Sequence, residues 1–274
     1  MAVKSIATIQ SLTGFGKSSL CVALPILTAS GIETSVLPSA VLSAHTGYSS
    51  PERADMNGFV EASLDNWSKN GFKFDALYSG YLCNKSQIES IIKNKRKILK
   101  ANGIFFCDPA MGDAGKLYSG FQNDFPKYML NLCKNADIIF PNVTEACLMS
   151  DTPYKENYDI DFVKELALKL QKNTCNTVVL TGVCIDNNVI STVVVTENEI
   201  NFIKAEKQSG NFHGSGDIFT SAFIASYMNC GDLLKSTEYA SRFVSLCIKD
   251  TKALKRDEKY GIIFENRLNL LRDI

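Results

Sequence analysis

Residues 74–109, FDALYSGYLCNKSQIESIIKNKRKILKANGIFFCDP, contain the pattern from which the fold can be predicted. The apolar runs FDALYSGY at 74–81 and IFFCDP at 104–109 have the length and composition of buried strands. Between them, residues 85–102 repeat isoleucine at helical spacing, and Gly103 follows as the expected cap of that helix. A strand, a helix and a second strand in this order favour two parallel strands joined by a crossover helix.

The same alternation continues on both sides of this unit. Gly31 and Gly71 are predicted to end the helices that precede them. Alternating strands and helices predict an α/β fold of three layers, with helices on both faces of a mostly parallel sheet. We expect a single domain over residues 1–274, because no internal repeat, low-complexity tract or Pro/Gly/Ser-rich linker divides the chain. The other strand-like runs are SIATIQ (5–10), TSVLPSAVLS (34–43), ADIIFPN (136–142) and TVVLTG (177–182).

The alternation changes between residues 189 and 207. Two strand-like runs, NVISTVVVT and EINFIKAEK, are separated there by a short polar turn around Glu197. This pattern predicts an antiparallel hairpin on or near the edge of the sheet. Two segments of helical length, 214–230 and 232–251, are expected to follow it.

The composition argues against several classes of partner. Hydrophobic residues make up 45% of the chain, and 29 basic residues balance 29 acidic ones, so nothing favours nucleic acid or an anionic membrane surface. No apolar run approaches the length of a membrane span, and the N-terminal residues lack the apolar stretch of a signal peptide. Nine cysteines without a CxxC pair are expected to be buried thiols. We therefore predict a cytoplasmic protein with no membrane or nucleic-acid partner.

Polar residues follow most of the predicted strands. In a parallel sheet, ligands bind outside the carboxyl ends of the strands, so the loops that leave those ends are predicted to converge on one site. The residues concerned are Ser11, His45 to Tyr48, Tyr81, Asp108 to Asp113, Asn142 to Glu145, and Thr181 with Gly182.

Two of these side chains have structural alternatives. A lone His45 is more often a packed or hydrogen-bonded loop residue than a catalyst, and a chain with two histidines has no His-rich metal site. Tyr81 is expected either to stack on an aromatic ring of a ligand or to be half-buried at the end of its strand.

The segment GFGKSS at 14–19 imitates two phosphate-binding motifs. A P-loop would need glycine at position 11, which is Ser11, and a dinucleotide fingerprint would need glycine or alanine at position 19, which is Ser19. We therefore predict a glycine turn beside a substrate pocket.

The segment HGSGDIF at 213–219 carries the strongest local signal. Gly214, Ser215 and Gly216 precede an apolar helix, whose first amide groups and positive dipole end suit a phosphoryl group that gains charge. Asp217 in the first turn could accept a hydroxyl proton. The alternative is an aspartate that only stabilises the helix dipole.

Two further loops carry carboxylates. DPAMGDAGKLY (108–118) contains Asp108 and Asp113, and PNVTEA (141–146) contains Glu145. Hard cations such as Mg²⁺ bind carboxylates and water, and phosphates complete their coordination. The alternatives are turn formation in the first loop and a helix N-terminus capped by Thr144 or Asn142 in the second, and both can hold together with metal binding.

Taken in order, these segments resemble the pyridoxal kinase group of the ribokinase-like superfamily from about residue 5 to residue 250. The resemblance implies a ribokinase-like fold and transfer of phosphate from ATP, with Mg²⁺, to the 5′-hydroxymethyl group of pyridoxal, pyridoxamine or pyridoxine. It also implies a homodimer. The segments that carry it are IQSLTGFGKSSLCVALPIL, LSAHTGY, YSGYL, DPAMGDAGKLY, PNVTEA, LTG and HGSGDIF.

The resemblance also assigns expected roles. Asp217 resembles the general base of the family, and Gly214, Ser215 and Gly216 resemble its anion hole. Ser11 and Thr46 look like groups that bind the substituents of the pyridine ring, with Tyr81 beside the ring. Asp113 and Glu145 match positions near the Mg²⁺ and phosphates, Asp108 and Thr181 match positions linked to a monovalent cation such as K⁺ or to the triphosphate, and Asn142 and Gly182 belong to the ATP side.

Three other functions are considered. Hydroxymethylpyrimidine kinase of thiamin synthesis shares the fold and the base. It stays an alternative because GFGKSS and Phe140 differ from the residues usual at these positions in vitamin B6 kinases. A non-catalytic nucleotide-binding relic of the fold would be expected to lack the base or the glycines, which this chain keeps. A sugar kinase would be expected to carry a lid of several strands, where residues 12–33 predict a turn and a helix.

Overall fold

The strand-helix-strand unit predicted from residues 74–109 lies at the centre of the sheet. In the computed structural model, which describes residues 3–174, 177–186, 188–210 and 212–274, β4 (Phe74–Ser79) and β5 (Leu99–Cys107) are parallel neighbours. They are joined by α3 (Lys85–Ile98). The predicted cap at Gly103 is wrong, because the helix ends at Ile98 and Leu99 at once adopts extended backbone, which places Gly103 inside β5.

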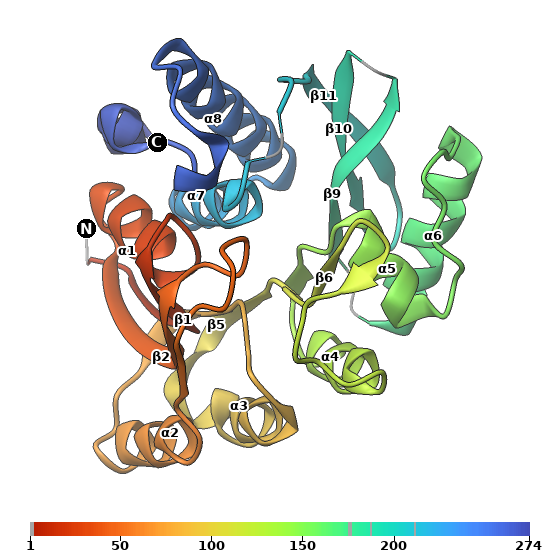
Figure 1. Cartoon of the computed structure of the whole chain (residues 1–274). Coiled ribbons are helices and arrows are strands. Elements are labelled where there is room, and N and C mark those ends of the chain that lie inside the picture. The colour runs from red at the N-terminus through yellow and green to blue at the C-terminus, as the bar shows by residue number, and fades with distance from the viewer. Residues whose placement is uncertain (1–2, 175–176, 187, 211) are drawn as a thin grey trace.

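The sheet has nine strands in the order β11-β10-β9-β8-β5-β4-β1-β2-β3 (Figure 1). The central strands are parallel, and the predicted hairpin is confirmed as an antiparallel pair at one edge. At the other edge a short antiparallel strand, β3, was not predicted. The remaining bounds are β1 (Ser5–Phe15), β2 (Glu33–Ala44), β3 (Arg53–Asp55), β8 (Ile138–Ile139), β9 (Thr177–Asp186), β10 (Val189–Val195) and β11 (Ile200–Glu206).

Two strands are longer than predicted, and this changes the place of two site residues. β1 continues past Gln10 to Phe15, and β9 continues to Asp186. Ser11 and Thr181 were expected just after their strands, but each lies within its strand. The irregular register between β1 and β2 beyond Gln10 accounts for the missed extension, since the apolar alternation is interrupted there.

The helices follow the predicted pattern. Gly31 and Gly71 have φ values of 84° and 72°, and each follows the C-terminal cap of a helix as expected. A small second sheet, β6 (Gly112–Asp113) and β7 (Lys116–Leu117), lies in the loop after β5. The other helices are α1 (Leu20–Ala29), α2 (Phe59–Lys69), α4 (Phe125–Cys133), α5 (Val143–Ser150), α6 (Ile160–Asn173), α7 (Ser215–Cys230) and α8 (Leu233–Ala253), with 3₁₀ helices η1 (Glu258–Tyr260) and η2 (Glu265–Asp273).

Two hydrophobic cores form the three layers that the sequence predicts. On one face of the sheet, Leu77 of β4 belongs to the core formed with α2 to α6. On the other face, Tyr78 of the same strand belongs to the core formed with α1, α7 and α8. Figure 1 shows α1, α7 and α8 gathered on one side and α4 to α6 on the other. The predicted α/β/α sandwich, with a mostly parallel sheet and an antiparallel edge hairpin, is confirmed.

Two predictions from composition concern the membrane and the thiols. Within the described ranges, no helix combines the length and the apolar character that crossing a bilayer requires. Five of the eight described cysteines are buried, whereas Cys21 and Cys184 are half-buried and Cys230 is exposed. The ninth, Cys175, lies outside the described residues.

Candidate active site

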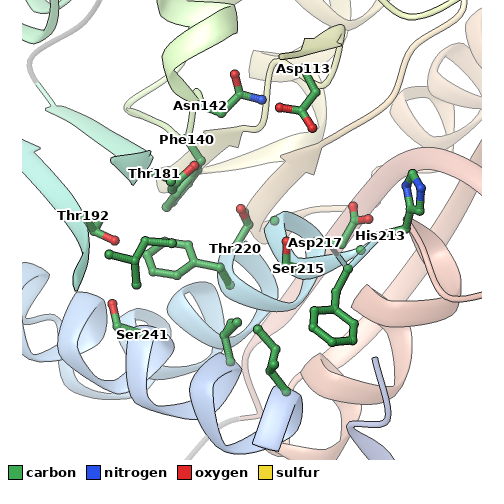
Figure 2. A pocket seen from close by; sticks show the side chains of 18 of the residues that line it. Asp113, Phe140, Asn142, Thr181, Thr192, His213, Ser215, Asp217, Thr220 and Ser241 are labelled. Atoms are coloured by element: carbon green, nitrogen blue, oxygen red, sulfur yellow. The ribbon is translucent and has the colours of Figure 1, made fainter. Parts of the chain in front are cut away.

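A pocket of about 420 Å³ lies where the loops after the parallel strands meet α7, α8 and the β10–β11 hairpin (Figure 2). It brings together most of the predicted site residues, which come from four separate segments of the chain. These are Asp108, Asp113, Asn142, Glu145, Thr181, Gly182, Gly214, Ser215, Gly216 and Asp217.

The start of α7 offers amide groups to this pocket. Gly214 is the N-terminal cap with φ 83°, and a Cβ at this position would lie 2.1 Å from the carbonyl oxygen of Lys17, so only glycine fits. Beside Gly216 the space is open. The amides of Ser215, Gly216 and Asp217 precede the first intrahelical bond, which Ile218 donates to Gly214 at 3.0 Å. The helix start can therefore receive an anionic group.

Asp217 is the titratable group nearest to these amides in sequence. Burial raises the pKa of its carboxyl to about 6, although the backbone N–H of Ser19 donates a hydrogen bond to it and lowers the pKa in part. The carboxyl group is therefore mostly ionised at neutral pH, and its carboxylate is a stronger base than that of an ordinary aspartate. A carboxylate of this kind can accept a proton from a bound hydroxyl.

Glu145 is held by a complete capping box at the start of α5. Its Oε2 accepts the N–H of Asn142 at 2.9 Å, while Asn142 Oδ1 accepts the N–H of Glu145 at 2.9 Å. Its Oε1 accepts the N–H of Met111 at 3.0 Å, and Asn142 Nδ2 donates to the carbonyl of Gly112 at 2.9 Å. The alternative with Asn142 as cap is therefore confirmed, and the same bonds fix the loop that carries Asp108 and Asp113.

The three carboxylates of this region place excess negative charge in one pocket. Burial raises the pKa of Glu145 to about 8 against its backbone N–H bonds, and the charge of Asp113 adds to the rise. Burial, then the charges of Glu145 and Asp217, raise the pKa of Asp108 well above its usual range. Asp113 itself is exposed. A cation would relieve this repulsion.

The donor set fits Mg²⁺ carried with phosphates. Across the part of the chain that the structure describes, no three His, Cys, Asp or Glu side chains converge closely enough to hold a metal ion by themselves. Mg²⁺ in phosphoryl-transfer sites commonly takes one or two carboxylates and completes its shell with water and phosphate oxygens. Asp113, together with Asp108 or Glu145, provides such a partial set.

The far end of the pocket was not predicted. Figure 2 shows Thr192 of β10 and Ser241 of α8 at the end away from His213. Val244 and Ile248 of α8 also line the pocket. These residues belong to an ordinary amphipathic hairpin and helix, and no motif distinguishes them in the sequence.

The residues predicted for the acceptor substrate do not line this pocket. Ser11 is 4% exposed within β1, and Thr46 is exposed in the turn after β2. Tyr81 is 8% exposed, and its hydroxyl accepts Arg53 Nη1 at 2.9 Å. Tyr118, which sequence reasoning missed, lines the pocket and packs against the cluster that contains Tyr81. Their roles toward a substrate stay predictions.

His45 has a structural role that its position in the loop only suggested. Its Nδ1 accepts the N–H of Gly47 at 3.1 Å, and its Nε2 lies 2.7 Å from the carbonyl oxygen of Lys259. Both ring nitrogens are therefore engaged with backbone groups. Its ring stacks on His213 with centroids 4.5 Å apart. His45 therefore supports the turn that precedes the α7 helix.

Comparison with known proteins identifies the family of the chain. Residues 29–263 match the family Phosphomethylpyrimidine kinase. The chain is similar in structure to a putative phosphomethylpyrimidine kinase from Bacteroides thetaiotaomicron in a crystal form with pyridoxal, with TM-score 0.93 and 30% identity over 100% of this chain and 96% of that one. It is also similar to a pyridoxal kinase from Lactobacillus plantarum, with TM-score 0.90 and 26% identity over 98% and 97% of the two chains.

A curated relative agrees with these structures. The pyridoxal kinase PdxY of Histophilus somni is 25% identical over 264 residues, which cover 91% of this chain and 90% of the relative. The predicted resemblance to kinases of the ribokinase-like superfamily is confirmed. Because the family match extends over most of its length, the chain belongs to the phosphomethylpyrimidine kinase family.

Proposed function

We propose that the protein transfers the γ-phosphoryl group of ATP to the 5′-hydroxymethyl group of pyridoxal, pyridoxamine or pyridoxine. One observation carries the proposal: Asp217, with its raised pKa, lies in the same pocket as the first amides of α7 and the acidic loops after β5 and β8. Relatives named pyridoxal kinases, and the related structure with pyridoxal, favour a vitamin B6 substrate.

The proposed step is the attack of the substrate hydroxyl on the γ-phosphorus of ATP. The hydroxyl oxygen bonds to the γ-phosphorus while the bond from that phosphorus to the bridging oxygen breaks and leaves ADP. The hydroxyl proton passes to the carboxylate of Asp217. The amides of Ser215 and Gly216 face the developing charge on the phosphoryl oxygens, and ordered amides in place need no rearrangement to stabilise it.

The ATP side is assigned to the acidic loops and β9. Asn142, Thr181 and Gly182 are proposed to contact the nucleotide phosphates. Asp113 and Glu145 with Asp108 would hold Mg²⁺, which supplies neutralisation of the phosphate charge when it is bound. Asp108 and Thr181 are also proposed to lie beside a monovalent cation such as K⁺.

A substrate panel tests the function. Pyridoxal, pyridoxamine, pyridoxine and hydroxymethylpyrimidine are each incubated with Mg-ATP, and the phosphorylated product is measured. We expect the highest kcat/KM with one of the three B6 vitamers. Higher kcat/KM with hydroxymethylpyrimidine would instead support the thiamin-synthesis activity, which the family description favours. Absence of product with all four alcohols would support the non-catalytic relic.

The substrate end of the site is tested at Ser11. If its hydroxyl bonds a ring substituent, Ser11→Ala removes one neutral hydrogen bond, which costs about 0.5–1.5 kcal/mol. The KM for the vitamin should rise about 2- to 12-fold by that figure, at about 1.4 kcal/mol for each tenfold, and the KM for ATP should stay unchanged. Steady-state kinetics with each substrate varied in turn measures both. A rise in the KM for ATP alone would place Ser11 on the nucleotide side.

A homodimer is proposed from the exposed apolar side chains of the β1–β2 edge. Leu12 (40% exposed) and Val41 (38%) are register partners, and Val36 (40%) lies on the same pair of strands. Exposed apolar side chains on neighbouring strands are a feature that an interface would cover. The mass of the protein in solution by light scattering tests it.

We further propose that residues 1–274 form one domain and that the protein acts in the cytoplasm.

A further inference from the structure

The GFGKSS segment contacts the start of α7 at two points. The N–H of Ser19 donates to Asp217, and the carbonyl oxygen of Lys17 lies against Gly214 so closely that a Cβ there would be 2.1 Å away. The turn therefore lies behind the amides and the carboxylate proposed for catalysis. The ammonium group of Lys17 pairs with Glu265, and Lys17 does not line the pocket. We therefore assign no phosphate-binding role to Lys17.

Ser19 adopts a backbone conformation that needs support. Its φ is 51° and its ψ is −126°, which residues other than glycine rarely adopt. Two local contacts hold the turn from one side: Ser19 forms an isolated bridge with Leu12, and the hydroxyls of Thr13 and Ser18 lie 2.9 Å apart. Strained backbone of this kind persists only where the surroundings fix it from several sides.

The C-terminal segment provides the support on the other side. Lys17 Nζ lies 2.5 Å from both carboxylate oxygens of Glu265 and 5.0 Å from the centre of the Phe264 ring. Gly261, with φ 77°, lies so near that its Cβ would be 3.0 Å from Lys17 Cβ. The Lys17 side chain is only 18% exposed, so its ion pair is screened less than a fully solvated one.

We propose that the Lys17–Glu265 ion pair positions the catalytic base. The pair joins the turn at residues 16–19 to the C-terminal segment, and this turn contacts Asp217 and Gly214. This inference rests on the proposed role of Asp217. Lys17 and Glu265 are positioning residues, since neither lines the pocket. The pair joins residues 248 positions apart, so the sequence gives no sign of it.

Glu265→Gln tests the proposal by removing the charge at nearly constant shape. We expect kcat to fall about 5- to 10-fold, while the KM for ATP stays within about twofold, because the turn contacts Asp217 and Gly214 and none of the residues assigned to the ATP side. Lys17→Met breaks the same pair from the other side and should give the same loss. Glu61→Gln, which breaks the exposed pair with Lys93, is the matched control and should leave kcat unchanged.

Combination with Asp217→Asn separates positioning from a general loss of structure. If Glu265 acts through Asp217, then Glu265→Gln should cost less than twofold in kcat once Asp217 is already asparagine. An equal loss in both backgrounds overturns the proposal, and so does a kcat for Glu265→Gln and Lys17→Met equal to that of Glu61→Gln. If Asp217→Asn alone keeps a near-normal kcat, the proposed role of Asp217 fails first, and this inference fails with it.

Discussion

Asp217→Asn is expected to lower kcat at least about 100-fold while the protein stays folded and still binds ATP. The alcohol that accepts the phosphoryl group has a pKa far above 7, so it attacks well only as its proton is removed. A positioned base contributes about 10²- to 10⁴-fold to such a step. Asparagine keeps the shape of the side chain and cannot accept the proton. Measurement of kcat, ATP affinity and the thermal midpoint on this variant checks the result.

The alternative role of Asp217 predicts a different outcome. An aspartate that only stabilises the dipole of α7 would contribute about 0.3–1 kcal/mol to stability, and its loss would leave turnover largely intact. Asp161→Asn is the matched control, because Asp161 lies in the first turn of α6, is exposed and is absent from the pocket. A near-normal kcat in Asp217→Asn, with a change in thermal midpoint like that of the control, would remove Asp217 from the mechanism.

The same carboxyl should set the acid side of the pH profile. Burial raises the pKa of Asp217 to about 6, and only its ionised form can accept a proton. The value of kcat/KM should therefore fall as pH drops through about 6, towards tenfold for each unit. Asp217→Asn should abolish this dependence along with most of the activity.

The sequence was sufficient for the fold because each level of the pattern agreed. Apolar runs at strand spacing, isoleucines at helical spacing and the glycines after α1 and α2 all predicted the same architecture. Gly103 misled for a local reason. A glycine after a helix usually marks its end, but here the chain turned into β5 at Leu99 before reaching it.

The predicted residues that share the pocket include several that lie close together in one loop. HGSGDIF places Gly214, Gly216 and Asp217 in the pocket, and DPAMGDAGKLY places Asp108 and Asp113 there. Contacts between distant segments could not be predicted. The support of Asp217 by Ser19, the contact of His45 with Lys259, and the wall formed by Thr192 and Ser241 depend on packing of elements that carry no motif.

Removal of divalent metal ions is expected to abolish turnover, and added Mg²⁺ should restore it. The expectation rests on the charge of the pocket, where Asp108, Asp113 and Glu145 face the place proposed for a triphosphate that is itself strongly negative. A bound cation would favour ionisation of these carboxyl groups and neutralise the phosphate charge, so its removal should prevent productive binding of the nucleotide.

Asp113→Asn should locate the metal more finely. Asp113 is the exposed carboxylate of the three, whereas Glu145 also holds the α5 capping box, so Asp113 can be changed with least harm to the fold. Loss of one carboxylate should raise the Mg²⁺ concentration needed for half-maximal rate about tenfold or more. Groups around a bound metal typically contribute about 10- to 100-fold to its affinity. Asp124→Asn, an exposed aspartate outside the pocket, is the control. Full activity in excess chelator, or a Mg²⁺ requirement in Asp113→Asn equal to that of the control, would show that these carboxylates do not bind the metal.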